Sequence, residues 1–187
     1  SGSATFLVDP GETVTCTFSN YRTPTWTLTI VKKANPADDT VFDFGVDLDM
    51  DGTADSSFTL SDPGDPSEVI PGVAGKTLKV VELPELNDWL FDDVECTGAT
   101  SYSHAGPTLT VTVPRDGATV CTFTNHKQGR ILVDKVTDPI NDPTLFTFNP
   151  SWSETDFQLA HATEPHNSGP LTPGNYGEVE TVEAAWH

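Results

Sequence analysis

The stretch that decides the fold is residues 119–123, which read TVCTF, and residues 108–113 before it read TLTVTV. Alternation of apolar and polar residues, rich in Thr, Val and Phe, is typical of a strand with one buried face. Residues 27–30, TLTI, repeat the pattern, and the 15 Pro and 14 Gly separate such segments. No stretch of about ten residues shows helical apolar spacing with caps. The sequence therefore predicts an all-β fold.

The chain also repeats itself. Residues 9–20, DPGETVTCTFSN, resemble residues 115–125, RDGATVCTFTN. Each is followed by a strand with a lysine, a Phe-x-Phe motif, a Phe-x-Leu motif, a Pro-Gly turn, a strand with a glutamate and a tryptophan. The tryptophans are Trp89 and Trp186. Such self-similarity indicates a repeated unit, here of roughly 100 residues.

The repeat frame is offset from the ends of the chain. We predict tandem Ig-like β-sandwiches, in which residues 28–125 form one complete domain and residues 131–187 an incomplete one that lacks its final strands. Residues 1–20 would be the orphan last strand of a preceding or neighbouring unit. Residues 21–27 and 126–130 would be linkers.

The composition excludes several classes of function. The chain has 28 acidic and 9 basic residues and a net charge of -19, so it lacks the basic patch that nucleic acid requires. No apolar run approaches the 18 or so residues that cross a bilayer, so we expect no membrane insertion in this segment, and any secretion signal lies outside it. No motif for a catalytic nucleophile, phosphate loop or zinc protease occurs, so we expect no enzyme activity.

The three cysteines fit the repeat. Cys96 follows Trp89 by seven residues, and Cys121 lies in the last strand of the same unit, so a Cys96–Cys121 disulfide is the natural pairing. Cys16 is the equivalent of Cys121, and its partner would lie outside the chain. A disulfide indicates an extracellular or cell-surface protein. The alternative is a cytosolic protein with buried free thiols.

The order of these motifs resembles the prealbumin-like, Cna protein B-type repeat domains of bacterial surface stalk and pilus-like proteins. The resemblance implies prealbumin-like β-sandwiches strung head to tail. Some members of this family form an isopeptide bond between a Lys of the first strand and an Asn of the last, assisted by a buried acid. Carried over, these residues are Lys32, Glu82 and Asn125 in the first unit and, between copies, Lys135, Glu180 and Asn20.

The bond requires a neutral lysine amine and a protonated acid in an apolar site. Three alternatives remain open. The first is that the lysines are solvated strand residues, the second is that the domains rely on the disulfide, and the third is that Lys33 takes the place of Lys32 as the inward-facing residue.

A short acidic loop is a candidate calcium site. Residues 47–55 carry carboxylates at alternate positions and Gly52 at the sixth, a pattern that suits a cation with oxygen ligands. The candidate ligands are Asp47, Asp49, Asp51 and Asp55. Position twelve is Phe58 instead of a bidentate Glu, so a plain hairpin turn is the alternative.

These features predict an extracellular structural repeat of a bacterial stalk or fibre, whose partner is itself. Residues 3–20 would enter the incomplete domain, 131–187, of the next copy by strand addition. The inserting side chains would be Phe6, Val8, Val14, Cys16 and Phe18. One alternative is a calcium-dependent adhesin that binds glycans. Another is that this sequence is a window of one long covalent repeat chain.

Overall fold

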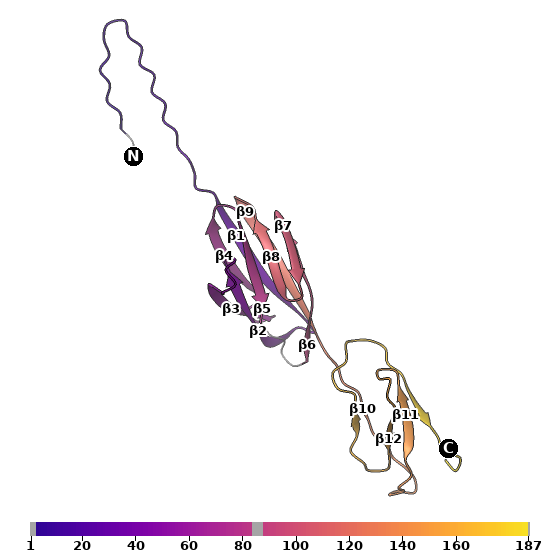
Figure 1. Cartoon of the computed structure of the whole chain (residues 1–187). Helices are drawn as coiled ribbons and strands as arrows, with labels where there is room; N and C mark the ends of the chain where they lie inside the picture. The colour runs from indigo at the N-terminus through magenta and orange to yellow at the C-terminus, as the bar shows by residue number, and fades with distance from the viewer. Residues whose placement is uncertain (1–2, 84–87, 187) are drawn as a thin grey trace.

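The structure is a computed structural model that describes residues 3–83 and 88–186. The all-β prediction is confirmed: the described residues form strands joined by turns and loops, in a larger group from β1 to β9 and a smaller one from β10 to β14 (Figure 1). None of them belongs to a helix long and apolar enough to span a bilayer. The strands are β1 (Thr25–Asn35), β2 (Asp38–Asp47), β3 (Ser56–Asp62), β4 (Ser67–Val73), β5 (Lys76–Glu82), β6 (Trp89–Thr97), β7 (Ser101–Ala105), β8 (Thr108–Val113), β9 (Gly117–Lys127), β10 (Leu132–Val133), β11 (Phe146–Pro150), β12 (Phe157–Leu159), β13 (His166–Asn167) and β14 (Glu178–Thr181).

The larger group is a sandwich of two sheets with strand orders β4-β1-β9-β6 and β3-β2-β5-β8-β7. Alternate residues of both sheets point into one core, for example Leu28, Phe44 and Phe123, each fully buried. This packing is what the period-two pattern predicts for strands with one buried face. The first strand begins at Thr25, inside the predicted linker, because Trp26 is itself a core residue with 3% exposure.

Strands β1 and β9 are the first and last strands of this sandwich, and they lie side by side. They pair in parallel along their lengths, from Trp26 opposite Gly117 to Asn35 opposite His126. The chain enters the sandwich through β1 and leaves it through β9 toward the smaller group. This pair therefore connects the two ends of the sandwich.

The smaller group has the same plan with fewer strands. Its sheets have the orders β10-β13 and β12-β11-β14, which correspond to β1-β4 and β3-β2-β5. Phe148 stacks on Phe157 at 5.3 Å with an interplanar angle of 8°, as Phe44 stacks on Phe58 at 5.3 Å and 8°. Among the described residues, no strand takes the places of β6 to β9, so β10 and β14 each have an open edge.

Residues 3–21 of the N-terminal segment pack against neither group; the segment first contacts the sandwich through Arg22, which pairs with Asp116, and through the Pro24 carbonyl, which accepts a hydrogen bond from the Ala74 N–H. It runs away from β1 and turns back on itself (Figure 1), with a turn closed by a hydrogen bond from the Glu12 N–H to the Asp9 carbonyl. The predicted last strand at residues 3–20 is thus an extended arm without strand partners among the described residues. Its apolar side chains lie in solvent: Phe6 is 50%, Val8 57% and Phe18 63% exposed.

Candidate functional site

Lys32 lies in the interior of the first sandwich. The alternation that buries Ile30 and Ala34 on β1 also turns Lys32 inward, where it is 1% exposed. Lys33, the alternative inward residue, points outward and is exposed. A lysine is almost never fully buried without a partner, so its surroundings define a candidate site.

Three side chains from three strands meet at this lysine. Lys32 Nζ on β1 donates a hydrogen bond to Asn125 Oδ1 on β9. Asn125 Nδ2 in turn donates to Glu82 Oε1 on β5, at 2.7 Å. Lys32 Nζ also lies 3.2 Å from Glu82 Oε1, and the two side chains are 0% and 4% exposed. The structure thus brings together the three residues of the first predicted isopeptide site.

Burial changes the protonation of the lysine. Desolvation lowers the pKa of Lys32 from 10.5 to about 8, although the negative charge of Glu82 acts in the opposite direction. Its ammonium also lies 4.0 Å from the centroid of the Phe42 ring, whose face attracts a cation. Moving one proton from Lys32 to Glu82 yields a neutral amine and a neutral acid beside the Asn125 carboxamide, which is the state that amide formation needs.

Phe42 is the residue of this site that the sequence reasoning missed. The Phe-x-Phe motif was available as a signal, but it served only to align the repeat. In both groups the first Phe of the motif lies under the lysine and against the tryptophan. Phe42 contacts Trp89 edge to face at 5.4 Å and 79°.

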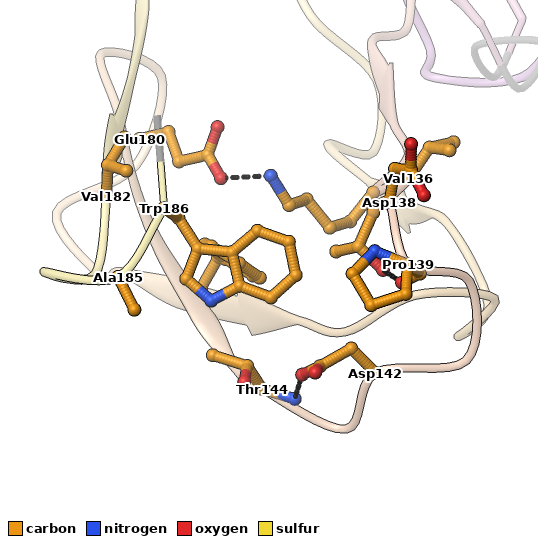
Figure 2. A pocket seen from close by; sticks show the side chains of 12 residues that line it. Val136, Asp138, Pro139, Asp142, Thr144, Glu180, Val182, Ala185 and Trp186 are labelled. Carbon is orange, nitrogen blue, oxygen red and sulfur yellow. Dashed lines mark hydrogen bonds and ion pairs between the residues drawn. The ribbon is translucent and has the colours of Figure 1, made fainter.

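The smaller group contains an open version of the site. Lys135 Nζ forms an ion pair with Glu180 Oε1 at 2.5 Å and lies 3.9 Å from the Phe146 centroid. Trp186 contacts Phe146 edge to face at 5.3 Å and 78°. Glu180 and Trp186 line a cavity of about 700 Å³, and Figure 2 shows their side chains facing it. The residues that line it all lie between 135 and 186, so the structure does not bring Asn20 to this pair.

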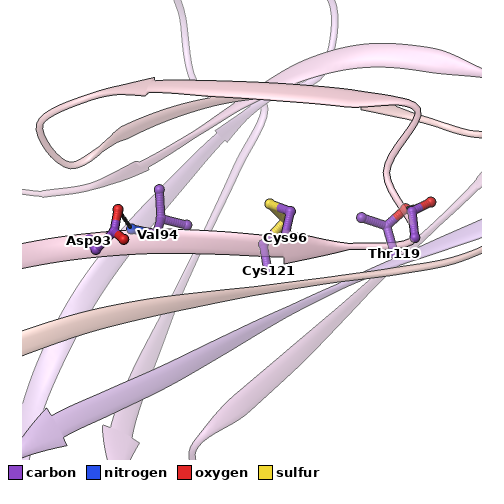
Figure 3. The surroundings of a disulfide bond; sticks show 6 residues. Asp93, Val94, Cys96, Thr119 and Cys121 are labelled. Carbon is purple, nitrogen blue, oxygen red and sulfur yellow. Dashed lines mark hydrogen bonds between the residues drawn. A yellow bond between two sulfur atoms is a disulfide. The ribbon is translucent and has the colours of Figure 1, made fainter.

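Two cysteines of the first sandwich are bonded. Cys96 on β6 and Cys121 on β9 are directly opposite each other, with Cα atoms 4.1 Å apart, and form a disulfide (Figure 3). Cys16 is a free, exposed thiol in the N-terminal arm.

The acidic loop follows β2. Carboxylate oxygens of Asp47, Asp49 and Asp55 lie within 4.8 Å of one another, whereas Asp51 is not part of this group. All four carboxylates accept hydrogen bonds from N–H groups of the loop, that of Asp51 from the Thr53 N–H at 2.7 Å. Desolvation alone would raise the pKa of Asp47, but backbone N–H donors of the loop lower it overall. These three carboxylates are therefore the candidate ligands for Ca²⁺.

Comparison with known proteins gives the family. The family described as the prealbumin-like fold domain matches residues 28–127, and the chain belongs to it. The matched residues span the larger group, β1 to β9, which is thus a β-sandwich of this class.

Several solved structures are similar. The TIE protein of Bacillus anthracis is 14% identical with a TM-score of 0.43, over 86% of this chain and 29% of that chain. The major pilin of Streptococcus pyogenes is 11% identical with a TM-score of 0.29, over 88% of this chain and 76% of that chain. The chain therefore spans about 29% of the length of the TIE protein. No curated protein matches it.

Proposed function

We propose that the chain is a load-bearing structural segment of an extracellular stalk or fibre, with an amide bond between Lys32 and Asn125. The observation that carries this proposal is the buried contact of Lys32, Asn125 and Glu82 inside a prealbumin-like sandwich. Burying a lysine and a glutamate together costs desolvation free energy. A role in forming a bond would explain why both residues are buried here.

The reaction is balanced without a co-reactant. The neutral Lys32 amine attacks the Asn125 side-chain carbon, while the protonated Glu82 carboxyl polarises the amide oxygen and shuttles protons. A new C–N bond forms, the bond to Nδ2 breaks, and that nitrogen leaves as ammonia. The mass of the chain falls by about 17 Da, and Glu82 is regenerated.

The bond would act along the path of the load. Force that enters β1 would cross from Lys32 to Asn125 and leave through the end of β9, so the chain between them would carry no tension. The disulfide alone shields only the 25-residue span from Cys96 to Cys121. The placement of the lysine site on β1 and β9 thus supports a mechanical role.

Single-molecule pulling on the full chain tests this role. We expect no extension from the segment between Lys32 and Asn125. In Lys32→Met, the 93-residue separation, less the 25 residues held by the disulfide, should extend by about 240 Å. Lys33→Met is the matched control and should pull like the wild type. Full extension of the wild-type chain would refute the proposal.

We propose further that copies join head to tail by strand donation. The arm aligns with β8, its turn and β9, so that Phe6 and Val8 correspond to the buried Val111 and Val113. Its second leg, residues 14–20, corresponds to β9. The first leg would lie beside β14, as β8 lies beside β5 in the first sandwich. The second leg would lie beside β10, as β9 lies beside β1. Because the contact is heterologous, it generates a filament.

Paired substitutions test the donation. Phe18→Asp places a charge at a position that would be buried, whereas Thr17→Asp places it at the neighbouring outward position. We expect light scattering and electron microscopy to show filaments for the wild type and Thr17→Asp, and single chains for Phe18→Asp. Filaments that persist in Phe18→Asp would refute the donation. Single chains in every sample would favour the alternative, in which the complementing strands come from the rest of a longer parent chain.

A calcium-dependent adhesin is the second candidate. It is supported by the Asp47, Asp49 and Asp55 carboxylates, which lie within 4.8 Å of one another. Calcium would then rigidify the loop that follows β2. A stalk domain should gain stability alone from Ca²⁺, whereas an adhesin should also gain binding to a glycan surface.

A further inference from the structure

We infer that the outer face of the sheet β4-β1-β9-β6 is a lateral docking surface for a second copy of this chain. The two copies would lie side by side, with this face of one against the same face of the other. The inference goes beyond the proposed stalk segment, because it uses neither the amide bond nor the strand donation.

The docking surface is the side of this sheet that turns away from the core. On β1, the alternation that buries Ile30 and Lys32 turns Thr27, Thr29 and Val31 outward. Side chains of residues that are paired across neighbouring strands lie on the same side of a sheet. The strand pairings therefore extend each of these three outward residues into a row that runs across the sheet.

Apart from Glu95 at their border, the three rows contain no ionisable side chain. The central row consists of Val69, Thr29, Val120 and Thr97, one from each strand. On β4, β1 and β9 the two flanking rows add only Thr, Val, Pro, Ala and Ser. We call the three rows, up to Glu95 on β6, the neutral face.

The apolar side chains of the neutral face are open to solvent. Val69 is 51% and Val120 is 38% exposed. The β-branched Val and Thr side chains are stiff and pack well on a pleated surface. Two such faces can therefore pack against each other as the two sheets of a sandwich do, about 10 Å apart.

The charge of the chain selects a second copy as the partner. With 28 acidic and 9 basic residues, the chain has a net charge of -19, so two copies repel each other where their acidic surfaces meet. This repulsion is weakest at the neutral face, so copies approach each other most readily there. A basic partner would instead be attracted to the acidic loop, which follows β2 of the opposite sheet.

The size of the neutral face indicates a weak contact. From the usual spacing of strands and of residues along them, four strands and three rows cover about 400 Å². Two copies would then bury about 800 Å², which is less than the roughly 1,200 Å² of a stable complex. A single contact would therefore be weak, but contacts repeated along two neighbouring fibres would reinforce one another.

Sedimentation equilibrium of the full chain tests the inference. Phe18→Asp is present in every sample, so that head-to-tail contacts do not contribute. We expect single chains at low concentration and dimers as the concentration approaches about 1 mM. Raising the NaCl concentration from about 0.05 M to about 0.5 M should strengthen the dimer, because salt screens the repulsion between the two acidic chains.

Substitutions locate the contact. Val120→Asp places an acid at the centre of each neutral face, so the two copies would repel each other and the Kd should rise at least about 10-fold. Val69→Asp on the edge strand β4 should have the same effect, and melting curves establish that both variants are folded. Val41→Asp is the matched control, because Val41 is 52% exposed on β2 of the other sheet. Its Kd should equal that of the parent.

Three results would overturn the inference. The first is equal weakening of the dimer by Val41→Asp, and the second is a dimer that dissociates as salt is added. The third is a chain that stays single up to about 1 mM in high salt, which would leave the neutral face to another kind of partner, such as a glycan. None of these results affects the amide bond or the strand donation, which the mass and filament measurements test separately.

Discussion

Replacement of Lys32 by methionine is the most direct perturbation of the first site. Methionine is similar in length and apolar, so it can occupy the space over Phe42 without a buried charge. The hydrogen bond from Asn125 to Glu82, at 2.7 Å, does not involve the lysine. The substitution therefore removes the proposed cross-link and leaves most of the packing in place.

The size of the effect follows from the loop that the bond closes. Lys32 and Asn125 are 93 residues apart, and on the chain-entropy model a cross-link over that separation contributes about 4.6 kcal/mol to the free energy of unfolding. For a domain of this size, each kcal/mol changes the Tm by about 4–8 °C. We therefore expect Lys32→Met to lower the Tm of the first sandwich by about 20–35 °C.

Intact-mass measurement and calorimetry together provide the assay. The wild type should weigh about 17 Da less than its sequence after reduction of the disulfide, and Lys32→Met should show no such deficit. The double variant Lys32→Met/Glu82→Gln removes the second buried charge and should melt near the single variant. Lys33→Met should match the wild type in both measurements. The reasoning is refuted if the wild type shows no mass deficit and melts within a few degrees of Lys32→Met.

Three further predictions concern the same sandwich. Replacing Cys96 and Cys121 by alanine opens a 25-residue loop, so denaturant titration should show a loss of about 3.5 kcal/mol, and an unchanged value would contradict a stabilising disulfide. Amide formation needs one proton shared between Lys32 and its glutamate. Because the pKa of Lys32 is about 8, the rate of amide formation during refolding, followed by the loss of mass, should fall above about pH 8. A rate of amide formation that rises through pH 9 would exclude this protonation state. Added Ca²⁺ should raise the Tm by about 3–6 °C at saturation in the wild type and in Asp51→Asn but not in Asp49→Asn, and an equal response of all three would exclude the predicted ligands.

The agreement between sequence and structure was best where a pattern is local. Alternation along β1 and β9 indicated strands, and the repeated order of motifs placed a lysine and a glutamate at equivalent points of both units. The bounds of the strands were harder to predict, because Trp26 belongs to β1 although it lies in the predicted linker. The acidic loop shows the same limit: Asp51 fits the spacing, but in the folded turn its carboxylate is not part of the group that Asp47, Asp49 and Asp55 form.

The sequence by itself determined the all-β class, and it named Lys32, Glu82 and Asn125 as candidate residues for an amide bond. Only the tertiary structure decided that they meet. Asn125 lies 93 residues from Lys32 and 43 residues from Glu82. Their contact depends on a parallel pairing of the first and last strands of the sandwich and on the packing of one sheet against the other. Such long-range pairings are properties of the whole fold, because no local pattern encodes which distant strand will lie beside β1.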